Sequence, residues 1–83
     1  MKRFNKPFYT AIGKRIKRQR LEKGFSREKL AQIANISDKF LYDIEVGNKG
    51  ISADTLYRIS ISLEISSDWL LSGKLYWNDF SAT

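Results

Sequence analysis

The chain has 83 residues, a formal net charge of +6, and neither cysteine nor histidine. A chain this short forms at most one small domain, which buries roughly 60–65% of the surface that the unfolded chain exposes. It has no thiolates for a disulfide framework or a zinc site and no histidine for general-base catalysis, so its positive charge points to a polyanionic partner rather than to an enzyme.

The positive charge is concentrated near the N-terminus. Residues 1–29 carry eleven basic residues and two acids, whereas residues 30–83 carry four basic residues and seven acids. Such asymmetry is typical of proteins that contact nucleic acid or a membrane surface. No apolar run approaches the roughly 18 residues of a membrane span, and no apolar segment follows the basic N-terminus as in a signal peptide. We therefore expect a cytoplasmic protein that does not act at a membrane.

Apolar periodicity predicts five short helices in chain order, within residues 10–23, 26–35, 37–47, 52–63 and 66–73. A serine begins each of the last four segments, which is a strong helix-capping signal. The apolar residues expected on the inward faces are Ile12, Ile16, Leu30, Ala31, Ile33, Ala34, Leu41, Ile44, Leu56, Ile59, Leu63 and Leu70. Because no segment shows sustained two-residue alternation, the pattern predicts an all-α domain.

The second and third predicted helices are separated by only three residues, from Asn35 to Ser37. Asn35 tolerates the left-handed conformation that a tight helix stop requires. A connection this short makes the two helices cross steeply, and Ala31 supplies a small side chain where they approach. The pattern predicts a helix-turn-helix, although an ordinary helical hairpin fits the same residues.

Four motifs in the same order carry a family resemblance: IKRQRLEKGFS, LAQIANIS, IEVGNKGISADTL and LEISSDWLLSG. The stretch from Ile12 to Gly73 that contains them resembles the Cro/cI-type (XRE-like) DNA-binding domain of phage repressors and bacterial regulators. The resemblance implies a compact five-helix, lambda-repressor-like fold. Its second and third helices would form the helix-turn-helix, and the third would enter the DNA major groove.

The resemblance also implies roles for individual residues of this chain. The base-reading positions fall on Asp38, Lys39, Phe40, Tyr42 and Asp43. The phosphate-binding positions fall on Lys17, Arg27, Ser37, Asn48 and Lys49. The family's buried ion pair between its first helix and the end of its third falls on Arg20 and Glu45.

Three residues depart from what such a domain would usually carry. Arg27 stands where the family often has glutamine; arginine keeps the ability to bind phosphate, while the brace to the recognition helix is left open. Asp38 and Asp43 could accept a hydrogen bond from cytosine N4, but both would repel phosphates. Alternatively, Asp38 stabilises the helix dipole and Asp43 pairs with Lys39, four residues earlier.

Both ends of the chain allow two interpretations. Residues 1–9 are expected as a basic arm that reaches the DNA backbone or minor groove, or as a frayed terminus. Residues 74–83 are expected as an aromatic tail after a helix-turn-helix domain at residues 10–73; it either folds back or joins two copies. The candidate dimer contacts are Trp69, Tyr76, Trp77 and Phe80.

Together these patterns predict a sequence-specific regulator of transcription that binds double-stranded DNA. We expect a repressor that binds a two-fold symmetric operator as a homodimer, without a cofactor, a metal or a small-molecule ligand. The alternative is a protein-interaction module on the same fold, such as an antitoxin or adaptor, that acts through its aromatic tail or acidic face. An enzyme is disfavoured because the usual nucleophile–base pairs are missing.

Overall fold

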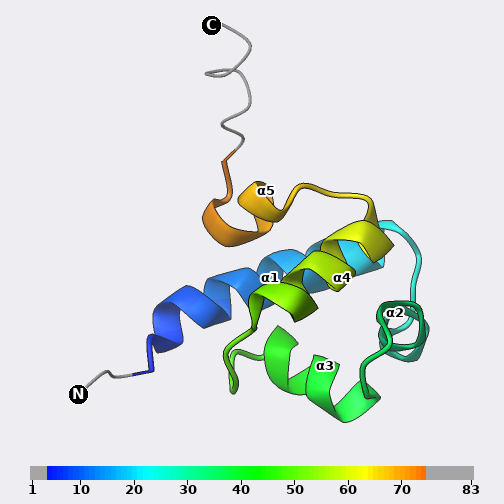
Figure 1. The fold of residues 1–83 in the computed structure, drawn as a ribbon, viewed down its shortest axis with the longest axis horizontal. Helices are drawn as coiled ribbons and strands as arrows, with labels where there is room; N and C mark the ends of the chain where they lie inside the picture. The colour runs from blue at the N-terminus through cyan, green and yellow to red at the C-terminus, as the bar shows by residue number, and fades with distance from the viewer. Residues whose placement is uncertain (1–3, 75–83) are drawn as a thin grey trace, which may run out of the picture.

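The computed structural model describes residues 4–74, which form five α-helices connected by short turns (Figure 1). The helices are α1 (Lys6–Glu22), α2 (Arg27–Ala34), α3 (Asp38–Glu45), α4 (Ala53–Leu63) and α5 (Ser67–Ser72). Within this described part of the chain there is no β-strand. The predicted all-α domain of five helices is therefore confirmed.

The longest helix, α1, is the centre of the arrangement. It packs against α3, α4 and α5, while α2 packs against α3 and α4. Figure 1 shows α3 and α5 on opposite sides of the layer formed by α1 and α4. As a result α3 lies at one edge of the molecule, with one side packed against α1 and α2 and the other side open.

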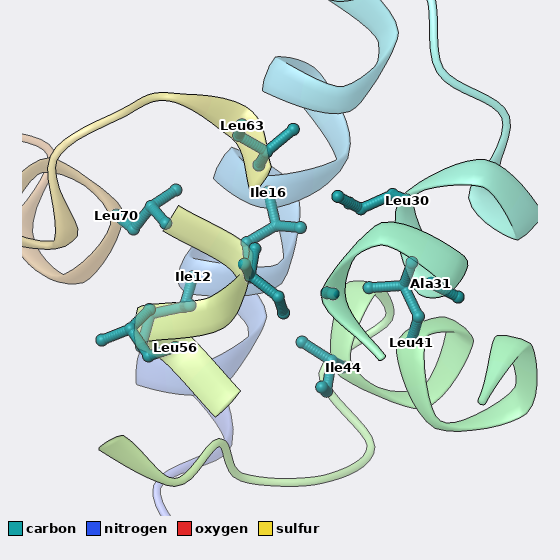
Figure 2. Close-up of a cluster of buried hydrophobic side chains, with 11 residues drawn as sticks. Ile12, Ile16, Leu30, Ala31, Leu41, Ile44, Leu56, Leu63 and Leu70 are labelled. Carbon is teal, nitrogen blue, oxygen red and sulfur yellow. The ribbon is translucent and has the colours of Figure 1, made fainter. Parts of the chain in front are cut away.

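Eleven apolar side chains from all five helices form one core, in which Figure 2 shows them converging between α1, α3 and α4. Every apolar residue expected on an inward face belongs to this core except Ile33, which is 44% exposed. On α2 the inward face is formed by Leu30, Ala31 and Ala34. At 100° per residue their mean direction lies between Leu30 and Ala31, which leaves Ile33 turned toward the surface.

The predicted helix starts are confirmed for the last four helices. The side-chain oxygens of Ser26, Ser37, Ser52 and Ser66 each accept a hydrogen bond from a backbone N–H of the first helical turn. Each such cap satisfies a donor that has no partner within the helix and stabilises it by about 1 kcal/mol. Asn35 ends α2 in the left-handed conformation, with φ of 60°, so the tight turn expected between α2 and α3 is present.

The start of α1 was predicted wrongly. The helix begins at Lys6, four residues before the predicted start at Thr10. The side chain of Asn5 accepts a hydrogen bond from the backbone N–H of Phe8 at 3.2 Å, and Pro7 lies in the first turn, where its missing N–H would have no helical partner anyway. These capping signals lie outside the apolar periodicity on which the prediction depended.

Gly13 is the point at which the backbones of α1 and α3 come closest. A Cβ atom at this position would stand 2.6 Å from the carbonyl oxygen of Glu45 and nearer still to that of Ile44. No side chain fits there, so only glycine allows α1 to contact the C-terminal end of α3 directly. Ala31, the small residue expected where α2 and α3 approach, is buried, whereas the role of Gly13 between α1 and α3 was not predicted.

Replacement of Gly13 by alanine tests this contact, because the close packing predicts a change in stability opposite in sign to that in an unconstrained helix. In an unconstrained helix the change would stabilise by up to about 1 kcal/mol. Here we expect Gly13→Ala to destabilise the protein by about 1–3 kcal/mol, because the new methyl group overpacks the contact between α1 and α3. Urea unfolding measures the difference. A Gly13→Ala protein as stable as the original would contradict the packing argument.

Candidate nucleic-acid interface

Two buried charges connect the end of α3 to α1. The Nε atom of Arg20 donates to Oε2 of Glu45 at 2.7 Å, and Nη2 donates to Oε1 at 3.1 Å. The remaining nitrogen, Nη1, donates to the carbonyl oxygen of Phe25 in the α1–α2 connection at 2.9 Å. Because a two-point contact between planar groups fixes their orientation, this pair sets the direction in which α3 leaves the core.

The open side of α3 carries a lysine and two aromatic residues. The Lys39 side chain is 78% exposed, Tyr42 is 42% exposed, and Phe40 is half-buried against the core. These three of the predicted base-reading residues therefore lie at the surface of the helix. A cation and apolar ring edges at such a surface suit contact with base edges and thymine methyl groups.

Asp43 faces inward, and its carboxylate is bound by cations of the chain itself. It accepts hydrogen bonds from the Lys39 ammonium at 2.9 and 3.2 Å, and the Lys49 ammonium lies 3.7 Å away. With 4% of the residue exposed, the carboxylate lies beneath these lysines, and the pairing with Lys39 that was expected as the alternative is present. The hydrogen bond from Lys39 and the two positive charges hold the pKa of the Asp43 carboxyl below its usual range.

Asp38, the first residue of α3, is bonded to the start of α2. Arg27 donates from Nε to Oδ1 of Asp38 at 2.7 Å, and its guanidinium lies 5.2 Å from the ring centroid of Tyr42. The hydrogen bond to Asp38 raises the pKa of the Arg27 guanidinium above its ordinary value. Arginine therefore connects the two helices here by an ion pair, so the brace to α3 that the sequence left open for this position is present.

The connection after α3 is held by a residue that was predicted to belong to the basic arm. Lys6 donates from Nζ to the carbonyl oxygen of Gly47 at 2.8 Å and to Oδ1 of Asn48 at 3.2 Å. A cation at the carbonyl end of a helix also favours the helix dipole. The arm prediction is wrong for Lys6, because the early start of α1 carries this side chain to the end of α3; residues 1–3 lie outside the described residues.

A pocket between α1, the start of α2 and α3 is lined by the cations Lys14, Lys17 and Arg27, by the paired charges of Arg20 and Glu45, and by Thr10, Tyr42 and Val46. Lys17 and Arg27 were among the predicted phosphate-binding residues. Lys14 was overlooked, although its place one helical turn before Lys17 puts both on the same side of α1. Cations gathered around a concave surface attract anions more strongly than isolated surface charges do.

Comparison with known proteins identifies this arrangement. A family model described as a helix-turn-helix domain matches residues 13–75. The chain belongs to the XRE-type helix-turn-helix family. In that family's terms, α2 and α3 with the turn between them are the helix-turn-helix, and α3 is the recognition helix. No curated protein matched the sequence.

Solved structures agree with this assignment. The N-terminal DNA-binding domain of SinR from Bacillus subtilis is 35% identical, over 81% of this chain and 99% of that one, with a TM-score of 0.75. SinR, a master regulator for biofilm formation, in complex with DNA is 37% identical, over 74% of this chain and 98% of that one, with a TM-score of 0.71. The restriction-modification controller protein C.AhdI from Aeromonas hydrophila shares the fold at 24% identity and a TM-score of 0.73, over 75% of this chain and 94% of that one.

Ser37 caps the recognition helix, with its hydroxyl accepting from the backbone N–H of Phe40 at 3.0 Å. Trp69 is half-buried and packs against the core. Tyr76, Trp77 and Phe80 lie outside the described residues. None of the described helices is both long enough and apolar enough to cross a bilayer.

The buried pair under the recognition helix predicts an asymmetry between single and double variants. Arg20→Met leaves the Glu45 carboxylate buried without a partner, and we expect it to destabilise the protein by about 3–5 kcal/mol. The double variant Arg20→Met with Glu45→Met leaves no uncompensated charge and should be more stable than the single one. Chemical denaturation of both proteins checks this; a double variant less stable than Arg20→Met would contradict it.

The lowered pKa values of two carboxyl groups predict how the stability of the protein depends on pH. The pKa of Glu64 is lowered by a hydrogen bond from Lys23 at 2.7 Å, and that of Asp43 by Lys39. A carboxyl whose pKa is lowered by folding stabilises the fold above its unfolded pKa, about 4, and this contribution is lost as pH falls through the lower, folded pKa. We therefore expect unfolding midpoints in urea to decrease below about pH 4 and to decrease less in Asp43→Asn. An equal decrease in both proteins would count against the Asp43 assignment.

Proposed function

We propose that this protein is a transcriptional repressor that binds a two-fold symmetric operator in double-stranded DNA as a homodimer, with α3 in the major groove. The proposal depends on how α3 is attached to the rest of the domain and on the side chain that its open side presents. The helix is attached to the preceding helices by the ion pairs Arg20–Glu45 and Arg27–Asp38, while its open side presents the exposed Lys39. SinR, which is similar over three quarters of this chain, has been solved in complex with DNA.

Phosphate contacts are proposed on both sides of α3. On one side the pocket lined by Lys14, Lys17 and Arg27 would accept a phosphate of the backbone. On the other side Asn48 and Lys49, both exposed, follow the C-terminal end of the helix. Contacts to phosphates position a protein on the duplex but carry no sequence information of their own.

Base contacts are proposed from the residues at the open side of α3. Lys39 would donate to guanine O6 and N7, and Phe40 would contact a thymine methyl group, with Tyr42 beside them. Asp38 is 43% exposed at its side chain and bonds to Arg27 through Oδ1. Its other oxygen would accept from cytosine N4, and the neighbouring guanidinium offsets the repulsion between the carboxylate and phosphates.

The homodimer is proposed from the aromatic residues at the C-terminal end of the chain. Aromatic side chains are enriched at interfaces between proteins. Trp69 on α5 precedes Tyr76, Trp77 and Phe80 within twelve residues of the sequence. Two copies that bind one face of the duplex would place their recognition helices about 34 Å apart.

The alternative of an interaction module that acts through an acidic face has little support. Asp38 is paired with Arg27, and Asp43 with Lys39 and Lys49. The acids of the recognition helix are therefore compensated within the chain and do not form a free acidic surface. An interaction through the aromatic tail is compatible with DNA binding by α3.

Selection of binding sites from random duplex DNA, followed by titration of the selected site, tests the proposal. We expect a two-fold symmetric site and an affinity that falls steeply with salt, because each neutralised phosphate contributes about −0.9 to the slope of log K against log salt. Lys17→Ala should make the slope shallower by about 0.9. Lys23→Ala, which removes a lysine that is paired with Glu64, should leave the slope unchanged.

Three results would contradict the proposal. Selection without enrichment of any sequence would exclude sequence-specific binding. An affinity independent of salt would exclude the phosphate contacts. An enriched site without two-fold symmetry, bound by a single copy in analytical ultracentrifugation, would exclude the homodimer while leaving DNA binding intact.

A further inference from the structure

Asp43 combines burial with two cationic partners from different segments. Its side chain is 5% exposed, whereas the Lys39 and Lys49 side chains that approach it are 78% and 59% exposed. Lys39 belongs to the same helix, one turn earlier, and Lys49 belongs to the connection that follows the helix. The carboxylate thus lies beneath two lysines that cover it from the surface.

Lys49 makes a second contact besides the one with the Asp43 carboxylate. Its ammonium lies 5.8 Å from the ring centroid of Phe40, within the range of a cation–π contact. The preceding residue, Asn48, donates its backbone N–H to the Asp43 carbonyl oxygen at 2.8 Å, and Lys6 binds the Gly47 carbonyl oxygen. The connection after α3 is therefore attached to the helix at several points, and Asp43 takes part in two of them.

An ammonium group has three donors, so a lysine that gives one or two hydrogens to a carboxylate keeps at least one for another acceptor. A lysine that is already ordered loses less side-chain entropy when it binds. A single negative charge beneath two positive charges also leaves a local balance of +1, with the positive charges on the outside. The arrangement therefore favours an anion at the surface in spite of the acid below it.

We propose that Asp43 is a positioning residue for DNA binding, which holds Lys39 of the recognition helix and Lys49 of the following connection side by side at the DNA-facing surface. The inference rests on the proposed function. It predicts that Asp43 strengthens binding to DNA, although the negative charge of its carboxylate alone would weaken binding. Simple electrostatics predicts that neutralising an acid strengthens binding to a polyanion. Positioning predicts that neutralising this acid weakens binding.

The test compares two substitutions that change the net charge equally. Asp43→Asn removes the buried carboxylate, whereas the control Asp54→Asn removes an exposed carboxylate on α4 that pairs with Arg58. Binding to the selected duplex is measured for both at the same salt concentration. We expect Asp43→Asn to raise the Kd about tenfold, equivalent to about 1.4 kcal/mol, and Asp54→Asn to leave it within about twofold of the original or lower it.

A double-mutant cycle separates positioning from a general effect on the fold. In a protein that carries Lys39→Met and Lys49→Met, the lysines that Asp43 orients are gone, so Asp43→Asn should no longer raise the Kd; it should leave the Kd within about twofold or lower it. A tenfold loss that persists in this background would show that Asp43 acts through the fold alone and would overturn the inference. An unchanged or stronger affinity of the single variant would overturn it as well.

A measurement without DNA keeps the inference separate from the proposed function. NMR relaxation of the lysine ε-methylene groups should show Lys39 and Lys49 more ordered than Lys29, an exposed lysine of α2, and should show this difference lost in Asp43→Asn. Equal mobility of all three lysines in the original protein would overturn the inference. If the ordering is present but the protein binds no duplex, the proposed function fails and the positioning of the two lysines stands.

Discussion

The contact between the backbones of α1 and α3 is the constraint on which the proposed DNA-binding surface depends. At Gly13 the two helices approach so closely that a Cβ atom would overlap the last carbonyl groups of α3. A contact between backbones cannot adjust by a change of rotamer, so it fixes the distance between the helices more firmly than packed side chains would. The Arg20–Glu45 pair on one side of this contact and the bond from Lys6 to Gly47 on the other then fix the rotation and the end of α3.

Electrostatics follows from the same arrangement. The recognition helix carries three acids, Asp38, Asp43 and Glu45, which would oppose contact with phosphates if their charges were free. Each instead has a cationic partner: Arg27 and Arg20 reach across from the preceding helices, and Lys39 and Lys49 cover Asp43. Compensation in pairs lets the helix be acidic in composition without an acidic surface. The remaining positive charge of residues 1–29 can then attract phosphates to the surface around the helix.

Local signals in the sequence predict the five helices, four of their starts and the family. Serine caps, the left-handed Asn35 and the spacing of apolar residues act within one or two turns of the chain. Two roles were missed for a different reason. Gly13 and Lys6 owe their roles to groups on another helix or in the connection that follows it. A single sequence contains both members of such a contact without indicating that they meet, although a lone glycine within a helical pattern is a signal for close packing.

The positions that were predicted to read bases are held by contacts within the chain, and this bears on the proposed recognition. Asp38 is bonded to Arg27 through one oxygen, Lys39 is bonded to Asp43, and Phe40 lies against both the core and Lys49. Side chains that are already ordered lose little entropy when they meet DNA, so a mismatched base is not accommodated by an alternative rotamer. Arg27 contributes to both kinds of contact, since it orients Asp38 and lines the pocket proposed for a phosphate. A phosphate bound there would compete with Asp38 for the same guanidinium or share it, and this would couple the position of the DNA backbone to the orientation of Asp38, the first residue proposed to read bases.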